Sequence, residues 1–351
     1  TPYQIKTTTD YLMLTRDIAN WGKCFKLYAD LNFSGINVIG IGNYDAKFSG
    51  TFDGDNHTIS NMILSTPDTE HGVAMFPRTH TTAIIKKLII NSPNVTGVTS
   101  EGEEMVNQIE TYHPSYTAVI AAENYGLIDE CIINTPTITI TQLAIQASYC
   151  GPFAGANHGI ITNSTCNGGT AKADITAKNS SYLGGVTGYQ HGGDTGQPVG
   201  KSENCYSSIS LSDVNHASTG YNIIAVGGIA GKATISNAGK NIVKNCHFTG
   251  SINYTSISCF NDAGKGLKVG GVIGLSSSDD ITDCSADCNI TVSTQSSQAS
   301  AIGGLIGEAE GTHLLARSWA DINIRNTYKS GVSSYVGGLI GHSGGTWTLS
   351  D

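Results

Sequence analysis

Gly184-Gly185-Val186-Thr187-Gly188 is one copy of a five-residue template that decides the fold of this chain. Copies begin at intervals of 33 to 45 residues along the 351-residue sequence. Repeats of such a period are typical of solenoids and other stacked architectures. Six copies carry glycines, at residues 151–155, 184–188, 227–231, 270–274, 303–307 and 337–341, and two weaker copies precede them at 73–77 and 118–122.

A second repeated position follows each template. It holds Cys131, Cys205, Cys246 and Cys284, with Leu88, Ser164, Ser318 and Ser350 in the other copies. Small side chains stacked in neighbouring coils about 4.8 Å apart would form an internal ladder. Disulfide dihedrals fit that spacing poorly, so we expect free thiols in the ladder. The pairing of the remaining cysteines stays open: Cys24, Cys150, Cys166, Cys259 and Cys288.

Short alternating strands follow the Cys position, for example at residues 252–255 and 289–292. Period-two alternation directs the aliphatic side chains inward and the polar ones outward. The sequence therefore predicts an all-β, right-handed parallel β-helix with three short strands per coil. The Gly-Gly pair then marks a corner, where the backbone either adopts a positive φ or approaches the neighbouring coil closely.

Residues 1–65 differ from the repeats and read as an N-terminal cap with the first coil. Thr8 and Thr9 are expected to cap one short α-helix that ends at Gly22. Its apolar face would be formed by Tyr11, Leu14, Ile18 and Trp21. Residues 66–351 form the repeat β-helix of about eight copies, the last one incomplete, so either more sequence or another subunit is expected beyond it.

Composition excludes two classes of partner. The formal net charge is −9 and basic residues do not cluster, which argues against binding nucleic acid. No apolar run approaches the roughly 20 residues of a spanning helix, which argues against membrane insertion. The chain opens at Thr1 without a Met, as expected of a processed or recombinant form.

Residues 48–64 (FSGTFDGDNHTISNMIL) and the Gly-Gly-Leu-Ile-Gly copies at 303–307 and 337–341 carry a family resemblance. They resemble the first segment and the repeat motif of bacterial GLUG-repeat proteins. The resemblance covers nearly the whole chain and implies a secreted or cell-surface β-helix of adhesin type. It implies no catalytic residues.

Tyrosines recur two positions before the template, at Tyr116, Tyr149, Tyr182 and Tyr335. The residue between each tyrosine and the template is mostly apolar and should point inward, so the tyrosines should point outward. Such an exposed ladder would offer aromatic faces to sugar rings. The alternative is a ladder that only stabilises the sheet by cross-strand packing.

Loops and carboxylates supply the remaining candidates. His191 and Asp194 form either a metal or acid–base pair or a solvated turn. An acidic patch of polysaccharide-lyase or glycosidase type could gather in loops of neighbouring coils, from Asp279 and Asp280, Lys232 or Lys240, and Glu308 or Glu310. Asp53, Asp55 and His57 resemble catalytic residues in isolation, but the GLUG-repeat resemblance implies that they are turn residues.

Three functions follow from these observations. The first is a non-catalytic extracellular scaffold or adhesin that binds a surface glycan or a cell-surface protein. The second is a structural subunit that assembles end to end with copies of itself. The third is a polysaccharide lyase or glycosidase on a β-helix. No cofactor is required by the first two, and a Ca²⁺ ion belongs only to the third.

Overall fold

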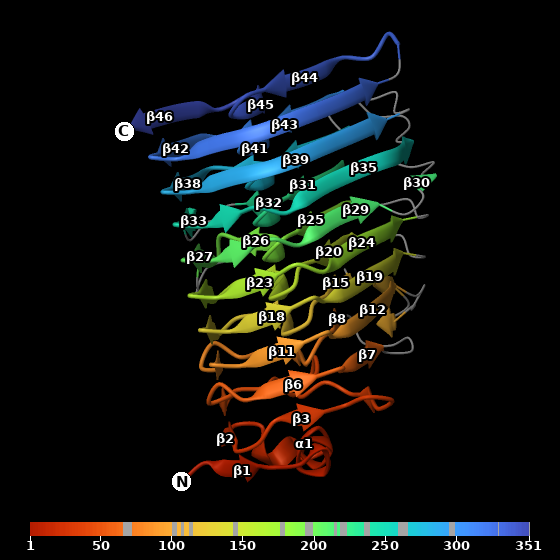
Figure 1. Ribbon diagram of the computed structural model, residues 1–351, viewed down its shortest axis with the longest axis vertical. Coiled ribbons are helices and arrows are strands. Elements are labelled where there is room, and N and C mark those ends of the chain that lie inside the picture. Colours follow the sequence, from red (N-terminus) through yellow and green to blue (C-terminus); the bar gives the residue numbers. More distant parts are fainter. Residues whose placement is uncertain are drawn as a thin grey trace.

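In the computed structural model the chain winds into a parallel β-helix that rises from the N-terminal cap to the last coil (Figure 1). The structure describes residues 1–65, 72–99, 104–106, 109–111, 115–142, 147–175, 180–193, 199–213, 216–217, 223–234, 239–258, 266–294, 299–328 and 330–350. The predicted all-β parallel solenoid with one short α-helix is confirmed. No helix in the described ranges is long and apolar enough to cross a membrane.

Four parallel sheets form the walls of the solenoid, and strands of successive coils pair in register. Sheet A contains β1 (Tyr3–Ile5), β2 (Cys24–Leu27), β5 (Thr51–Asp53), β10 (Ile84–Lys86), β17 (Leu127–Asp129), β22 (Ile160–Thr162), β27 (Lys201–Glu203), β33 (Asn241–Lys244), β38 (Asp279–Thr282), β42 (Thr312–Ala316) and β46 (Thr346–Ser350).

Sheet B is the longest wall and receives two strands from most coils. It contains β3 (Leu31–Asn32), β4 (Asn37–Val38), β6 (Thr58–Ser60), β7 (Ile63–Ser65), β11 (Ile89–Asn91), β12 (Asn94–Thr99), β18 (Ile132–Asn134), β19 (Thr137–Gln142), β23 (Thr165–Asn167), β24 (Thr170–Ile175), β28 (Tyr206–Ser207), β29 (Ser210–Asp213), β30 (His216–Ala217), β34 (His247–Phe248), β35 (Ser251–Ser258), β39 (Ser285–Thr294) and β43 (Trp319–Tyr328).

Sheets C and D lie on either side of the glycine template. Sheet C precedes it, with β8 (Gly72–Val73), β15 (Ser115–Thr117), β20 (Ser148–Cys150), β25 (Ser181–Gly184), β31 (Ile223–Gly227), β36 (Gly266–Gly270), β40 (Ser300–Gly303) and β44 (Ser334–Gly337). Sheet D follows it, with β9 (Phe76–Arg78), β16 (Ala121–Asn124), β21 (Ala154–Asn157), β26 (Thr187–His191), β32 (Ala230–Thr234), β37 (Ile273–Ser277), β41 (Ile306–Glu310) and β45 (Ile340–Ser343). A separate antiparallel pair joins β13 (Glu104–Val106) and β14 (Ile109–Thr111).

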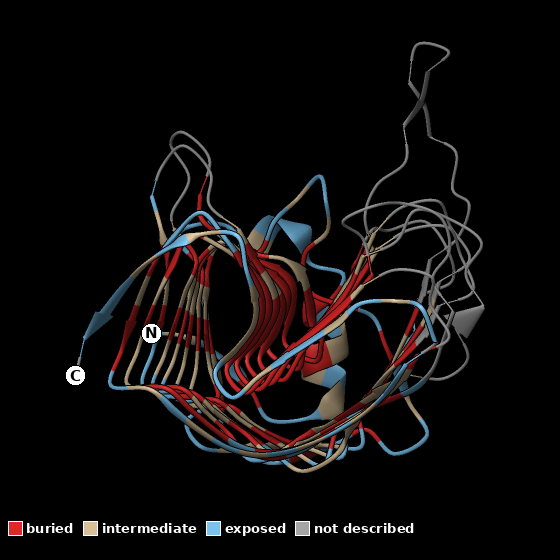
Figure 2. Cartoon of the chain, turned by 90° about the horizontal axis from the view of Figure 1, so that it is seen from above, coloured by how far each residue is buried: buried red, intermediate tan, exposed pale blue. Residues whose placement is uncertain are grey.

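The prediction of three strands per coil was wrong, because a middle coil such as β20 to β24 has five. Sheets C and D turn into the middle of the cross-section instead of following its rim, as the end-on view shows (Figure 2). Their strands in the middle coils are consequently buried on both faces; β25 and β36 have no exposed residue. Strands that run around a simple rim would instead bury only one face.

The glycine template lies at a corner where the backbones of neighbouring coils approach each other closely. Among the described residues, none of the template glycines has a positive φ. Of the two explanations predicted for the Gly-Gly pair, close approach to the neighbouring coil is therefore the correct one. A Cβ on Gly185 would lie 2.0 Å from the carbonyl oxygen of Gly228 in the next coil. A Cβ on Gly188 would lie 2.2 Å from the backbone nitrogen of Cys150, on sheet C of the preceding coil. The glycines thus let coils stack at the corner and let sheet D lie against sheet C.

The corner between sheets A and B has a different chemistry. Left-handed residues turn the chain there, among them Asn163, Asn204 and Asn245, each with φ near 50°. Asn204 donates to Asn163, and Asn245 donates to Asn204, through side-chain amides at 2.9 Å. The next residue in each coil is the small side chain of the predicted internal ladder.

Cys131, Cys205, Cys246 and Cys284 occupy that internal position and are buried. Their thiols donate to backbone carbonyls, and burial raises the pKa of Cys131 to about 12. The eight described cysteines are free, and only Cys24 among them is exposed. Cys259 lies outside the described residues.

The cap departs from its prediction in detail. The helix α1 (Thr8–Leu14) begins after Thr7, whose hydroxyl accepts from the Asp10 backbone while the Asp10 carboxylate accepts in return. The helix ends at Leu14, so Ile18 lies in a separate 3₁₀ turn (Ile18–Asn20) and is 56% exposed. Trp21 is buried, and its indole donates to the Leu14 carbonyl at 2.9 Å.

Substituting Gly228 with Ala should destabilise the solenoid by roughly 1–3 kcal/mol, because the added methyl would lie 2.2 Å from the Gly271 carbonyl oxygen and from Phe248. Gly338 is the matched control: it holds the same template position in the last coil and has no atom within 4 Å of its Cβ site. Urea midpoints of both variants measure the effect. Equal midpoints would contradict the close-approach explanation.

The buried thiols should resist alkylation in the native protein, since the thiolate is the reactive form and burial disfavours it. Iodoacetamide labelling with peptide mapping should modify Cys24 first and the ladder cysteines only after denaturation. Rapid native labelling of Cys246 would contradict this. Cys246→Ser should fold, because Ser164 and Ser318 occupy equivalent positions.

Candidate functional site

The outward faces of sheets C and D meet in what we call the seam. In-register positions of sheet C and sheet D face each other across it. Sheet C contributes Tyr116, Tyr149, Tyr182, Ala225, Lys268, Ala301 and Tyr335, and sheet D contributes Arg78, Glu123, Ala156, Tyr189, Lys232, Leu275, Glu308 and His342.

Three of the predicted tyrosines stack along the seam. The ring centroids of Tyr116 and Tyr149 are 5.3 Å apart and those of Tyr149 and Tyr182 are 5.0 Å apart, with nearly parallel planes. Tyr189 of sheet D stacks on Tyr149 at 5.1 Å. The predicted ladder therefore exists, but the prediction that it is exposed was wrong for Tyr182, which is 4% exposed. Sheet D covers it, which alternation within one strand could not reveal.

The stacked tyrosines have little aromatic face to offer a ligand. Their neighbours occupy the ring faces, and Lys232 lies over the ring of Tyr182 at 4.8 Å from its centroid. Burial raises the pKa of Tyr116 and of Tyr149 above the ordinary range. Tyr335 lies apart from the ladder and packs on His342, with ring centroids 4.7 Å apart. The geometry of Tyr116, Tyr149 and Tyr182 is that of cross-strand packing.

Charged side chains inside the seam form ion pairs, except Lys232, which lies over the rings of Tyr182 and Tyr189. Arg78 lies 3.0 Å from Glu123, and Lys268 contacts Glu308, whose side chain is 10% exposed. His342 also approaches Glu308, at 3.4 Å. Burial of an unpaired charge costs far more than burial of a hydrogen-bonded pair, so these contacts make the seam a second packed layer.

His191 stands beside a second histidine, while Asp194 lies outside the described residues. The ring centroids of His191 and His158 are 4.7 Å apart, and Tyr125 stacks on His158 at 4.4 Å. The backbone N–H of Gly193 donates to His191 Nδ1. Burial, and then the neighbouring His191, lower the pKa of His158 to about 3.

The predicted acidic patch around Asp279 does not form at the surface. Asp279 and Asp280 lie on β38 and not in a loop as predicted. Asp279 is fully buried, where it accepts from the side chains of Asn241 and Ser276, and burial raises its pKa. Asp280 pairs with Lys240 at 2.9 Å.

Ser276, Asp279 and His313 bring together the residue types of a hydrolytic triad. All three are completely buried; the serine hydroxyl donates to the aspartate, and its oxygen lies 3.3 Å from His313 Nδ1. His313 Nε2 lies 2.8 Å from the backbone carbonyl of Glu310, and Trp347 stacks on the ring. A nucleophile must reach its substrate, so this network is structural.

Of the three residues predicted at turns, Asp55 lies in the turn between β5 and β6, Asp53 is the last residue of β5, and His57 directly precedes β6. Asp55 has a φ of 49°, and its N–H donates to Asp53 Oδ1. Lys26 pairs with Asp55 at 2.9 Å and Lys86 with Asp53 at 3.3 Å. His57 Nδ1 lies 3.2 Å from Asp30.

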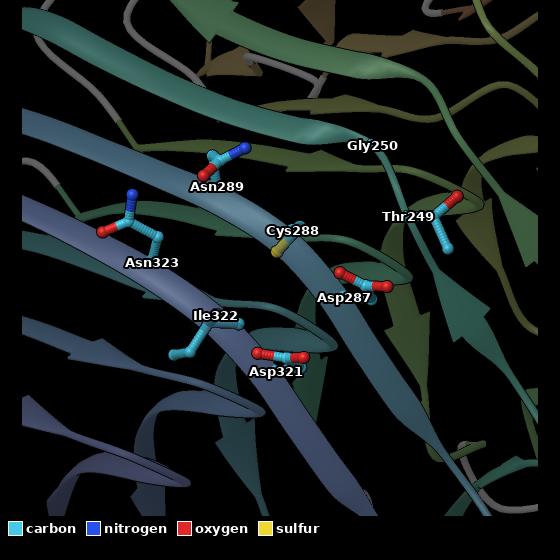
Figure 3. Close-up of a pocket in the computed structure, with 8 residues that line it drawn as sticks. All are labelled: Thr249, Gly250, Asp287, Cys288, Asn289, Asp321, Ile322 and Asn323. Carbon is cyan, nitrogen blue, oxygen red and sulfur yellow. The ribbon is translucent and has the colours of Figure 1, made fainter.

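A depression of about 400 Å³ opens on the outer face of sheet B near the C-terminal end. Figure 3 shows its lining, which comes from β39, β43 and the link between β34 and β35: Thr249, Gly250, Asp287, Cys288, Asn289, Asp321, Ile322 and Asn323. It was not foreseen from the sequence.

The depression forms where a broken strand lies beside a continuous one. Left-handed residues divide the strands of sheet B in earlier coils, for example Ser92 and Thr135. The strands β39 and β43 instead run ten residues without a break. Because β39 pairs with both β34 and β35, the break at Thr249 and Gly250 lies beside Asp287 and Cys288.

Two carboxylates line the depression side by side. Asp287 and Asp321 pair in register on β39 and β43, as do Asn289 and Asn323 (Figure 3). Both aspartates are exposed, and neither has an ion-pair partner within 4.0 Å among the described residues. No group of three or more His, Cys, Asp or Glu able to hold a metal is found among those residues.

Trp319 lies on the same outward face, two residues before Asp321, or about 7 Å along the strand. It is 54% exposed, and within the described residues its ring stacks on no other aromatic ring. Its strand neighbour Ser285 is small and buried, and its Oγ lies 2.8 Å from His247 Nδ1. The open indole face, the amides and the carboxylates together form a polar surface with one flat apolar platform.

No family model matches the chain, and no curated protein sequence matches it. Among solved structures, the chain is similar to a "putative immunoglobulin A1 protease" from Bacteroides ovatus, with a TM-score of 0.47 and 18% sequence identity over 96% of this chain and 84% of the other. The site described above therefore stands on its own geometry.

His158 should make the protein less stable in acid. Its pKa is lowered to about 3, so the folded state binds fewer protons than the unfolded state between about pH 6.5 and pH 3. The free energy of unfolding should therefore decrease as the pH is lowered across that window. This group contributes at most about 1.4 kcal/mol per pH unit.

Urea titrations of the His158→Phe variant should show a shallower acid loss, because Phe keeps the stacking on Tyr125 but binds no proton. His80→Gln, which replaces an exposed histidine, is the control. Identical pH profiles for wild type and His158→Phe would contradict the assignment.

Proposed function

We propose that this chain is a non-catalytic extracellular recognition scaffold, of the kind that GLUG-repeat surface proteins represent, and that it binds glycans on the outer face of sheet B. The observation that carries the proposal is the open face of Trp319 beside a depression lined by amides and carboxylates. The extracellular location is part of the same proposal and derives from the sequence resemblance.

The chemistry of the surface fits a sugar chain. The apolar face of a pyranose ring packs on an exposed indole, and its hydroxyls hydrogen bond to amide and carboxylate groups. Trp319 supplies the platform, while Asn289 and Asn323 supply both donors and acceptors. Neighbouring β-strands hold these groups at fixed spacing, so little side-chain ordering is needed on binding.

This surface suits a glycan better than the tyrosine ladder of the seam. The faces of Tyr149 and Tyr182 are occupied by neighbouring rings and by Lys232. Only ring edges remain there, and a sugar ring stacks on faces. The proposed glycan site therefore moves from the tyrosines named in the sequence analysis to Trp319.

Hydrolysis is the second candidate function, and the pair Asp287 and Asp321 is what favours it. Glycosidases of the retaining type hold two carboxyl groups about 5–5.5 Å apart, close to the spacing of neighbouring strands. Such enzymes also raise the pKa of one carboxyl by enclosing it, whereas both aspartates here are exposed on an open surface. Binding without cleavage is the better fit.

Trp319→Ala should reduce binding to the glycans that the wild-type chain captures on an array by at least about tenfold, since an aromatic platform of this kind is a typical hot spot. Trp319→Phe should retain part of the affinity. Tyr328→Ala is the matched control, because Tyr328 lies on the same strand, is 51% exposed and is distant from the depression.

Mass spectrometry of the bound oligosaccharides distinguishes the two candidate functions. Intact oligosaccharides are expected after prolonged incubation. Shortened products that are absent with the Asp287→Asn variant would show that hydrolysis, and not binding alone, is the function of this surface. Unchanged binding by Trp319→Ala would refute the proposed site.

A further inference from the structure

We propose that the site selects glycans with free amino groups, and that the ammonium of an amino sugar lies between Asp287 and Asp321. This inference rests on the proposed function, since it names the class of glycan that the surface would take. It is carried by three features together: the carboxylate pair and the amide pair that line the depression, and the open indole face of Trp319 beside it.

The carboxylates occupy equivalent positions of adjacent strands. Asp287 pairs with Asp321 in register, so their backbones are about 4.8 Å apart and both side chains leave the same face of sheet B. Figure 3 shows the two carboxylates side by side, with the amides of Asn289 and Asn323 on the same two strands. Two fixed anions thus stand next to two neutral amides.

Nothing in the described part of the chain neutralises this pair. The nearest cation on the same strand face is Arg325, four residues beyond Asp321 and therefore about 13 Å along the strand. Like charges about 5 Å apart repel in water, and they repel more strongly where solvent is partly excluded. A ligand cation placed between them would relieve that repulsion and gain two charge-assisted hydrogen bonds.

An ammonium on a sugar ring meets the geometry of the whole surface. It has three donors, so it can reach both carboxylates at once. The ring that carries it can lie toward Trp319, and the hydroxyls of the next ring reach Asn289 and Asn323. A hydroxyl or an acetamido group in the same place would leave both anions unneutralised.

Other cations fit the surface less well. A hard divalent cation takes six or more oxygen ligands, and the described residues provide no cluster of three or more carboxylate, histidine or cysteine ligands. A lysine-rich peptide would use the aspartates but would leave the platform and the amide pair without a role. These occupants are outcomes of the test below.

Calorimetry with three β-1,4-linked oligomers of equal length tests the inference: glucosamine, N-acetylglucosamine and glucose oligomers. At about pH 6 and low salt, the glucosamine oligomer should bind most tightly to the wild-type chain. Asp287→Asn and Asp321→Asn should each weaken that oligomer about fivefold, the effect of one exposed ion pair, and leave the glucose oligomer unchanged. Asp45→Asn removes an exposed carboxylate at the other end of the molecule and is the control for net charge.

The outcomes separate the two proposals. Equal affinity for the three oligomers, lost in Trp319→Ala, would overturn the selectivity for amino sugars and leave glycan recognition intact. Absence of binding to all three by the wild-type chain would overturn the selectivity and count against glycan recognition. Binding of Ca²⁺ or of an oligolysine peptide at the same aspartates, without the glucosamine oligomer, would overturn the inference in favour of that occupant.

Discussion

The fold depends on backbone contact at the glycine corners. Gly185 lies so close to the carbonyl of Gly228, and Gly188 so close to the backbone of Cys150, that no side chain fits at either place. That contact turns sheets C and D into the middle of the cross-section (Figure 2) and buries both of their faces in the middle coils. The seam, the burial of Tyr182 and the pairing of Lys268 with Glu308 all follow from it.

In-register stacking then decides which side chains each column tolerates. Uncharged groups gain from an identical neighbour: tyrosines stack in the seam, asparagines exchange hydrogen bonds at the corner, and thiols pack in the interior. Charged groups in the seam contact an opposite charge, as Arg78 does with Glu123 and Lys268 with Glu308, or an aromatic ring, as Lys232 does. Asp287 beside Asp321 departs from this rule, because like charges meet in register without a described counter-charge. A cationic ligand would supply that counter-charge.

Sequence periodicity predicted the solenoid because each repeated residue has the same structural role in every coil. The glycines remove a Cβ at a contact, and the small residue of the Cys position fills a fixed interior space, so both recur wherever a coil recurs. The orientation of Tyr182 could not be read in the same way. Alternation says which side of a strand a residue leaves, but not whether another sheet covers that side.

The carboxylate pair was missed for a related reason. Aligning residues 285–294 with 319–328 places Asp over Asp and Asn over Asn, so the signal was present in the sequence. Its meaning depends on the strands running straight through this position, where Ser92 and Thr135 break the earlier coils with left-handed turns. A left-handed turn between Asp287 and Asn289 would have pointed their side chains in different directions. The continuous strands β39 and β43 instead place both pairs on the same face as Trp319. The loss of the break thus places the indole, the amides and the carboxylates on one face of sheet B, which is the arrangement that recognition of an extended chain requires.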